Sequence, residues 1–429
     1  MTKVVFMSKK TVGVGFEEIP KEKRQSWISL ASIWTGAMIS IPSLMIGGLL
    51  AGGFNMTGAM ISMIIGYGII CLYMSFIGMQ ACDTGLPTST LVAGALGTTG
   101  SRFVVSALLA ITCMGWFGVQ TGIAAIAFST MFYSLTGILV PVWLAGLFWG
   151  LVMLITAIFG YNAIKYLNYI TIPGLAIVLG YGLWAAMTQN DGMNVIAAYI
   201  PAQPMTFVMG INLVVASFAV GGVISGDFAR YAHNRRDVIK SSVFGVLPAA
   251  VIVVAIGLML SIVVGEFDIT SVLVALGLPV IGLVMLIIAT WSTNVVNAFS
   301  GGVAVTNLFG AGDKKFKLMT AVAGGIGTIL GAVGIINLFV MFLSILTAFV
   351  PPVAGVMIAN YWICGKGKRE NFRVVEGIHL PGIIAFALGA AAAYTTGSIV
   401  PFLIAPVNGI VVSIVAYVLL EKHLPKRAG

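Results

Sequence analysis

Long apolar segments, separated by short polar stretches, run along almost the whole chain. A membrane-spanning helix needs roughly 20 apolar residues, and twelve segments of about that length can be marked. The connections between them are mostly short, and none carries a soluble domain. The expected helices lie near residues 27–53, 57–80, 103–134, 138–159, 165–187, 207–229, 241–265, 272–306, 317–334, 336–363, 380–394 and 397–420.

The composition narrows the class of protein. The 429 residues are 59% hydrophobic and 8% charged, whereas soluble domains are about a quarter charged. Soluble enzymes, nucleic-acid binders and secreted scaffolds are therefore excluded, and an all-α polytopic membrane protein is expected. The cysteines form no CxxC pair, so neither a metal centre nor a disulfide framework is expected; they are Cys71, Cys82, Cys113 and Cys364.

The basic residues fall on alternate connections. With the N-terminus taken as cytoplasmic, all 22 Lys and Arg lie in the tails or in cytoplasmic connections, and the opposite connections carry only Asp191, Glu266 and Asp268. The positive-inside rule then predicts an even number of spans with both termini cytoplasmic. The net charge of +9 reflects this topology and not an acidic partner such as nucleic acid. We expect a protein of a bacterial-type cytoplasmic (inner) membrane that functions as a monomer.

Two segments contain residues that interrupt a helix. The first has Pro42 followed by Gly47 and Gly48, and the sixth has Gly221 and Gly222. Proline removes a backbone donor and glycine favours unwinding, so unwound backbone lining an enclosed cavity is expected at both. Close helix packing is the alternative use of these glycines.

Interruptions at the first and sixth positions indicate an inverted repeat of five helices around a transporter's central site. The expected organisation is a cytoplasmic N-terminal tail over residues 1–26, a first repeat over 27–187 and a second repeat over 188–363. Two further helices and a cytoplasmic tail follow over 364–429. Pro351 and Pro352 predict another bend, in the tenth segment.

No charged side chain lies well inside an apolar segment. Asp227 and Arg230 stand at the cytoplasmic end of the sixth, where interfacial positions are expected. Because proton relays use ionisable groups at depth, the pattern disfavours such a relay, and it disfavours a strongly charged substrate. We expect a neutral substrate, with any coupling ion held by hydroxyl and carbonyl oxygens, the ligands that hard cations accept.

The eighth segment concentrates polar side chains. Ser292 and Thr293 stand one turn after the carbonyl of Ala289, and Asn294 and Asn297 share a helical face. Hydroxyls in membrane helices commonly bond back to their own helix. Two hydroxyls and two amides within six residues nevertheless indicate an ion site beside a polar ligand site.

The third segment carries a stripe with a period of four residues, made of Thr112, Trp116 and Gln120. Trp116 lies near the middle of its segment between glycines, which suits stacking against a flat ligand, with core packing as the alternative. Phe218, just before the interruption in the sixth segment, can supply a facing ring.

These residues resemble the nucleobase–cation symporter-1 family, in particular its bacterial cytosine and purine permeases. The resemblance covers most of the chain and rests on the order of several short strings: 32–36 (SIWTG), 115–119 (GWFGV), 217–218 (SF), 227–230 (DFAR), 291–294 (WSTN) and 351–358 (PPVAGVMI).

The resemblance implies a leucine-transporter-like fold with a 5+5 inverted repeat plus two helices. It implies Na⁺ symport of a neutral nucleobase, cytosine or a related pyrimidine or purine, by alternating access and without an organic cofactor. The base would lie between Trp116 and Phe218, with Asn294 at its polar edge. The candidate substrate contacts are Trp116, Phe218, Ser217, Gly221, Asn294, Gln120, Cys113, Thr112 and Asn297. The implied Na⁺ ligands are Ser29, Ser32, Ala289, Ser292 and Thr293.

Two positions depart from the cytosine-permease pattern. Cys113 replaces a Gln three residues before the stacking Trp, and Val220 replaces a Ser. Because a buried polar partner discriminates strongly between ligands, hydroxymethylpyrimidine and other flat heterocycles stay open as substrates. So do an amino-acid carrier of the same fold, proton-coupled or uncoupled uptake, and a passive facilitator.

An intramembrane enzyme is the remaining alternative. It is disfavoured because the three histidines, His233, His379 and His423, all fall in or beside cytoplasmic connections. No catalytic constellation is therefore available at membrane depth.

Overall fold

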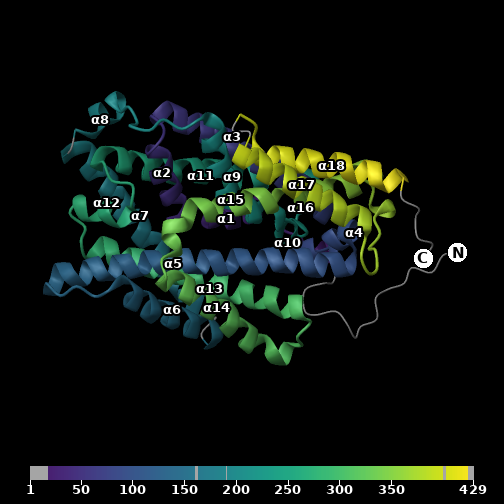
Figure 1. Cartoon of the computed structure of the whole chain (residues 1–429), viewed down its shortest axis with the longest axis horizontal. Helices are drawn as coiled ribbons and strands as arrows, with labels where there is room; N and C mark the ends of the chain where they lie inside the picture. Colours follow the sequence, from purple (N-terminus) through teal and green to yellow (C-terminus); the bar gives the residue numbers. More distant parts are fainter. Residues whose placement is uncertain (1–17, 160–162, 190, 400–401, 424–429) are drawn as a thin grey trace.

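The computed structural model describes residues 18–159, 163–189, 191–399 and 402–423. All regular elements in these ranges are helices, and a single isolated bridge pairs Gln25 with Ala232. Figure 1 shows their arrangement. They are α1 (Trp27–Met38), α2 (Ile41–Ala51), α3 (Met56–Thr84), α4 (Thr88–Gly100), α5 (Ser106–Thr136), α6 (Val142–Phe159), α7 (Ala163–Gln189), α8 (Gly192–Ala198), α9 (Phe207–Val223), α10 (Gly226–Ala229), α11 (Arg235–Val264), α12 (Ile269–Ala275), α13 (Ile281–Phe309), α14 (Phe316–Ala332), α15 (Phe339–Phe349), α16 (Pro351–Ile358), α17 (Leu380–Ile399) and α18 (Ala405–His423).

Each expected segment corresponds to a helix or a run of helices. In the described part of the chain nine are long and apolar enough to cross a membrane, or ten if the bent pair α1–α2 is one span. The shorter apolar helices α9 and α14 occupy the sixth and ninth expected positions. The count of twelve spans stays a prediction.

The eighth expected segment, 272–306, differs from the structure at its start. Residues 269–275 form the separate helix α12, and the long helix α13 begins only at Ile281. Gly277 adopts a φ of 79° and Pro279 follows it, so the chain turns where the hydrophobicity alone shows no interruption.

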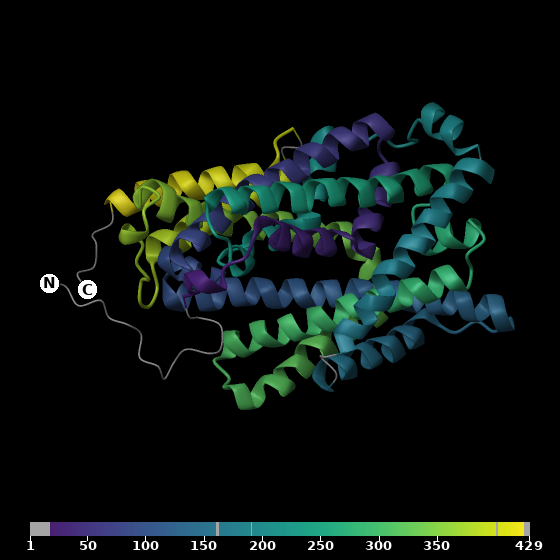
Figure 2. The ribbon, with the colours of Figure 1, turned by 180° about the vertical axis from the view of Figure 1, so that it is seen from behind.

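The long helices form two groups that lie side by side (Figures 1 and 2). In one group α11 packs against α1, α2 and α3, and α3 packs against α9. In the other, α5 packs against α13, α14 and α6, and α14 also packs against α6 and α13. The first, second, sixth and seventh long segments thus form one unit, and the third, fourth, eighth and ninth form the other.

The predicted break in the first segment is present. The axes of α1 and α2 differ by 58°, and the change occurs at Ile39 and Ser40. Pro42 cannot donate to the carbonyl of Met38, and its ring would clash there in a continuous helix. The Ser40 N–H donates to that carbonyl instead, at 3.0 Å.

The predicted break in the sixth segment is also present, as a kink inside α9. Phe218 has the non-helical angles φ −132° and ψ 17°. The Ser217 hydroxyl donates to the Val214 carbonyl (2.7 Å), and the Tyr73 hydroxyl of α3 donates to the Ala219 carbonyl (2.9 Å). Carbonyls on both sides of the kink therefore have side-chain partners, as the interior of a membrane requires.

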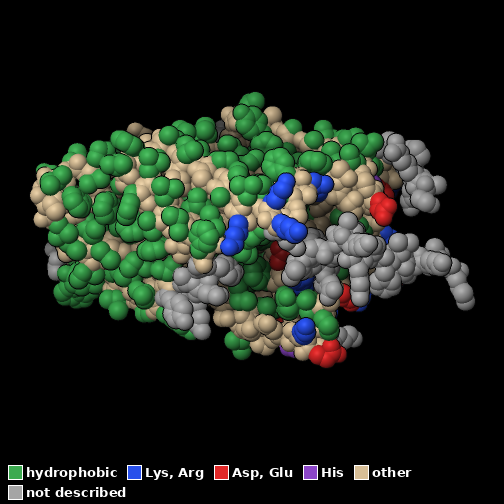
Figure 3. Space-filling model, turned by 90° about the horizontal axis from the view of Figure 1, so that it is seen from below, with side chains coloured by type: hydrophobic (Ala, Val, Ile, Leu, Met, Phe, Trp, Pro, Cys, Tyr) green, Lys and Arg blue, Asp and Glu red, His purple; other side chains and the backbone are tan. Residues whose placement is uncertain are grey.

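The two ends of the molecule differ in charge. The short helices α8 and α12 lie at one end, whereas α4 and the last turn of α18 lie at the other (Figure 1). Figure 3 shows Lys and Arg side chains gathered toward the α4 end of an otherwise mainly hydrophobic face. Asp227 is half-buried at this end and accepts the Thr88 N–H at the start of α4 (2.8 Å). Most of the expected cytoplasmic tails, residues 1–17 and 424–429, lies outside the described residues.

Glycine contacts between α2 and α11 generate the first prediction. A Cβ on Gly257 would overlap the backbone of Leu44, whereas a Cβ on Gly68 in α3 would meet nothing within 4 Å. We expect Gly257→Ala to destabilise the protein by about 1–3 kcal/mol, because backbone cannot move aside. The matched Gly68→Ala change should be neutral or slightly stabilising. Melting temperatures in detergent test this, and equal values for the two variants would contradict it.

Candidate functional site

Trp116 lies in the first half of α5 and forms the aromatic centre of the candidate site. Its ring meets the rings of Phe339 and Phe342 of α15 edge-on, at centroid distances of 5.8 and 5.4 Å. A Cβ on Gly115 would overlap the Phe342 ring, so glycine at this position permits the approach of α15. The sequence stripe predicted Trp116 but missed both Phe partners, although their spacing of three residues places them on one helical face.

Gln120 lies one turn beyond Trp116 and is 1% exposed. Both polar atoms of its amide are buried and have no hydrogen-bond partner, and the buried Thr112 hydroxyl on the same stripe also lacks one. Unpaired buried polar groups are uncommon in proteins and cost about 1–3 kcal/mol each. The predicted stripe of Thr112, Trp116 and Gln120 therefore combines an aromatic ring with unsatisfied donors and acceptors.

Phe218, at the kink of α9, has different neighbours from Trp116. Its ring meets Trp34 of α1 edge-on, at a centroid distance of 6.1 Å, and it covers Gly221, where a Cβ would overlap it. Ser217 lies within 3.3 Å of the Tyr67 hydroxyl of α3. The ring contacts of the described residues thus do not bring Phe218 onto Trp116, and a sandwich of a ligand between the two stays a prediction.

Asn294 of α13 is fully buried and ties α13 to α5. Its amide nitrogen donates to the Phe117 carbonyl (3.0 Å) and to the Thr121 hydroxyl (3.1 Å). Asn297, which is half-buried, donates to the Asn294 amide oxygen (3.2 Å). The predicted shared face of the two amides is present, and Asn294 also positions the helix that carries Trp116.

The predicted oxygen cluster of α13 is compact. The Thr293 hydroxyl donates to the Ala289 carbonyl at 3.1 Å, and Ser292 is 4% exposed. These three residues offer one carbonyl and two hydroxyl oxygens within about one turn, a donor set that suits a hard cation. In the described ranges no group of three or more His, Cys, Asp and Glu residues can hold a metal ion.

Ser29 and Ser32 lie in the first half of α1 and are exposed. The Ser29 hydroxyl donates to Gln25 (2.8 Å), and the Ser29 carbonyl accepts the Ser32 hydroxyl (2.7 Å). Helix α1 packs mainly on α11, whereas α13 packs mainly on α5, α14 and α7. The structure therefore does not bring these two serines to the α13 cluster.

The two positions that depart from the cytosine-permease pattern face different surroundings. Cys113 is half-buried and lies against Gly301 of α13. Val220 lines an apolar cavity of about 20 Å³ between α5, α9 and α16, together with Val105, Leu109 and Val353.

A second cavity, of about 300 Å³, lies beyond α15. Phe339, which contacts Trp116, forms part of its wall, and Phe267, Asp268 and Asn337 also line it. It borders the start of α12, and α12 lies at the end of the molecule opposite to α4 (Figure 1).

The family of the chain follows from its sequence. Residues 18–419 match a family described as permeases for cytosine/purines, uracil, thiamine and allantoin. The chain belongs to this permease family. It is 30% identical over 411 residues to the cytosine permease of Escherichia coli K12, covering 95% of this chain and 94% of that protein. It is 25% identical over 426 residues to the hydantoin permease of Microbacterium maritypicum, covering 92% and 84%.

Solved structures show the same fold. The inward-facing conformation of Mhp1 superimposes with a TM-score of 0.84 at 20% identity, covering 97% of this chain and 94% of that one. Mhp1 in a closed conformation with bromovinylhydantoin bound, described as a nucleobase-cation-symport-1 family transporter, gives 0.76 at 20% identity and 96% coverage of both chains. The resemblance found in the sequence and the all-helical leucine-transporter-like fold are both confirmed. The chain is a multi-pass membrane transporter of the nucleobase permease type and not an enzyme.

The tie made by Asn294 generates the second prediction. We expect Asn294→Ala to lower stability by about 1–3 kcal/mol, because it removes the donor that the Asn294 amide supplies to the Phe117 carbonyl and to the buried Thr121 hydroxyl. Asn297→Ala, which removes a half-buried amide from the same face, should cost clearly less. Melting temperatures measured without ligand test the difference. An Asn294→Ala protein as stable as Asn297→Ala would contradict this role.

Proposed function

We propose that this transporter imports a neutral nucleobase, cytosine or a related pyrimidine or purine, by Na⁺ symport with alternating access. The observation that carries the proposal is the unpaired, buried amide of Gln120 one turn from Trp116. An amide offers donors and an acceptor side by side, which complements the N–H and C=O groups on the edge of a nucleobase. The Trp116 ring supplies a flat apolar surface against which such a base can stack.

The absence of charge supports a neutral ligand. The unpaired polar groups of the Trp116 stripe are a hydroxyl and an amide, those of Thr112 and Gln120. The α9–α10 segment contains one acidic residue, Asp227. Its carboxylate accepts a hydrogen bond from the Thr88 N–H at the start of α4. A charged substrate would be left without a counter-ion in a medium of low dielectric constant, which is costly.

Relatives broaden the substrate class beyond one base. Their names include cytosine, hydantoin and allantoin permeases, all ring compounds with adjacent N–H and C=O groups. Cys113 lies against α13, and Val220 lines an apolar cavity, so neither replaces the polar partner expected for cytosine. Hydroxymethylpyrimidine, or an amino acid carried by the same fold, is the alternative substrate.

The coupling cation belongs, in this proposal, between α13 and the break of α1. Ala289, Ser292 and Thr293 supply oxygens from α13. The last turn of a helix leaves carbonyls without intrahelical partners, and the last turn of α1 ends at Met38. A cation shared by the two helices would couple the α1 group to the α5–α13 group, because its binding stabilises one relative placement of the two. Proton-coupled and uncoupled uptake are the alternatives.

Ser29 and Ser32 take another role in this scheme. They share an exposed face of α1 with Gly36, which has nothing within 4 Å of the place of its Cβ. Polar side chains exposed at a membrane helix face water more favourably than lipid. We assign this face to the cytoplasmic access path, in a monomer of the inner membrane with both termini cytoplasmic.

The Gln120 amide generates the third prediction. We expect Gln120→Leu to weaken binding of the transported base about 10- to 100-fold, because two hydrogen bonds worth about 1 kcal/mol each are lost. The matched control is Gln80→Leu, which removes another fully buried and unpaired amide. Gln80 lies in α3, which packs in the other helix group from α5. Isothermal titration on purified protein gives the affinities. Equal affinities for the two variants would refute the assignment of Gln120.

The identity of the base is tested by thermal shift. The panel holds cytosine, uracil, purines, hydroxymethylpyrimidine, hydantoin, allantoin and neutral amino acids, each with Na⁺ and with choline in its place. Ligand binding to the folded state raises the melting temperature by mass action. A nucleobase shift that requires Na⁺ is expected. If only an amino acid raised the melting temperature, the proposed nucleobase substrate would be wrong. If a nucleobase raised it equally with Na⁺ and with choline, the proposed Na⁺ coupling would be wrong.

The α13 oxygens generate the fourth prediction. We expect Thr293→Val to raise the Na⁺ concentration for half-maximal base uptake about tenfold, because one cation ligand is lost. Thr290→Val is the control, since the buried Thr290 hydroxyl bonds to the carbonyls of its own helix at Leu286 and Ile287. Uptake into proteoliposomes with an imposed Na⁺ gradient gives both values. If Thr293→Val left the Na⁺ dependence of uptake unchanged, Na⁺ would not bind at this turn of α13.

A further inference from the structure

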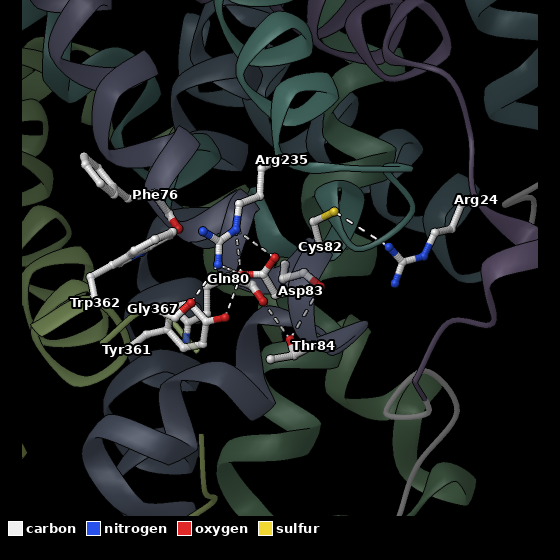
Figure 4. A network of polar contacts seen from close by, with 11 residues as sticks. Arg24, Phe76, Gln80, Cys82, Asp83, Thr84, Arg235, Tyr361, Trp362 and Gly367 are labelled. Carbon is white, nitrogen blue, oxygen red and sulfur yellow. Dashed lines mark hydrogen bonds and ion pairs between the residues drawn. The ribbon is translucent and has the colours of Figure 1, made fainter. Parts of the chain in front are cut away.

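A cluster of polar contacts joins three helices at the α4 end of the molecule (Figure 4). Arg235, the first residue of α11, donates from Nε and Nη2 to the Asp83 carboxylate of α3, at 2.6–3.0 Å. The Tyr361 hydroxyl donates to the same carboxylate at 2.6 Å. Tyr361 belongs to η5 (Ala359–Cys364), which continues α16. One carboxylate therefore holds the ends of α3, α11 and α16–η5 together.

The loop that follows η5 is fixed by the same arginine. Arg235 Nη2 donates to the Gly367 carbonyl at 2.7 Å, and the guanidinium lies 4.8 Å from the centre of the Trp362 ring. Trp362 in turn donates to the Phe76 carbonyl of α3 at 3.1 Å. The planar fork of arginine suits such simultaneous bonding and stacking, which a lysine cannot reproduce.

The backbone of this loop is held in an uncommon conformation. Lys366 has a φ of 55° and Gly367 a φ of 62°, and a left-handed residue other than glycine persists only where surrounding contacts fix it. The Gly367 N–H donates to the Tyr361 carbonyl (2.9 Å), and Asn371 donates to the Gly365 carbonyl (2.9 Å). The loop thus presents the Gly367 carbonyl to Arg235 in a defined position.

Local helix energetics do not account for the ion pair. Asp83 lies in the last turn of α3, where the helix dipole disfavours a negative charge, and Arg235 begins α11, where it disfavours a positive charge. Each charge opposes its own helix and is compensated by the other. The contact is therefore a tertiary one, made across 152 residues of sequence.

The loop also reaches α4, which precedes the other helix group along the chain. Beyond Gly367 it bonds to α4, where Thr98 and Thr99 donate to the carbonyls of Val375 and Gly377 (both 2.8 Å). Helix α4 leads into α5, which carries Trp116. A continuous path of contacts thus runs from α3 and α11, through Arg235 and the loop, to the start of the α5 group.

We propose that Arg235 and Asp83 are positioning residues for transport. They clamp η5 and the loop over residues 365–379 to α3 and α11, so that movement of the α1–α3–α9–α11 group is passed on to α4 and α5. The substrate does not touch the clamp. Its loss should slow the change between conformations and leave equilibrium binding of the base unchanged.

The test compares Arg235→Gln with Arg236→Gln, which removes the same charge from the next, exposed residue. Hydrogen–deuterium exchange over residues 359–379, measured without base or Na⁺, should rise in Arg235→Gln alone. The initial uptake rate should fall about tenfold, with the dissociation constant for the base unchanged within error. If Arg235→Gln showed the same hydrogen–deuterium exchange and the same uptake rate as Arg236→Gln, the proposal would be wrong. The exchange measurement involves no substrate, so it stands apart from the assignment of the transported base.

Swapping the two charged residues tests whether the contact acts as a three-way clamp or only as an ion pair. Asp83→Arg combined with Arg235→Asp keeps opposite charges and places each at the favourable end of its helix. It removes the donor to Gly367 and the acceptor of Tyr361. We expect this variant to fold, with exchange and uptake still impaired, and full restoration would overturn the three-way clamp. If Arg235→Gln does not fold, Tyr361→Phe tests the same tie by removing a single hydroxyl, and normal exchange and uptake in that variant would overturn it.

Discussion

The need to satisfy every backbone polar group without water governs this structure. A continuous helix meets it automatically, so each place where a helix breaks must find partners elsewhere in the protein. At the α1–α2 break the Met38 carbonyl accepts a hydrogen bond from the Ser40 N–H. At the α9 kink the Val214 and Ala219 carbonyls accept hydrogen bonds from side-chain hydroxyls. These breaks are possible only because α3 and α11 pack closely around them, and glycines such as Gly257 allow that approach.

The same requirement separates the polar side chains by role. Asn294 is fully committed to joining α13 to α5, and Thr290 is satisfied by its own helix. Gln120 is equally buried and has no partner. An unpaired amide opposes folding, and in the proposed function a ligand beside Trp116 completes the bonds of Gln120. The ligand proposed for this place is a neutral one, and the chain belongs to a family of permeases for cytosine/purines, uracil, thiamine and allantoin.

Charge is used at the ends of the helices and avoided between them. The central helices carry hydroxyls and amides, whereas the ion pair of Asp83 and Arg235 lies where α3 ends and α11 begins. An ion pair there avoids the cost of burying charge in the membrane. It gives the end of the molecule a specific set of contacts that apolar packing alone would not define.

The sequence by itself determined the class of protein, the order of the helices and the positions of the two breaks. Each depends on local properties, namely apolar length, proline geometry and the spacing of Lys and Arg. Periodicity also identified the stripe through Trp116, because it reports which residues share a face of one helix. It could not report what that face meets, since contacts such as Phe342 on Trp116 and Asp83 on Arg235 join distant segments. Only the tertiary structure decided these partners, and the exposure of Ser29, because they depend on how separate helices pack.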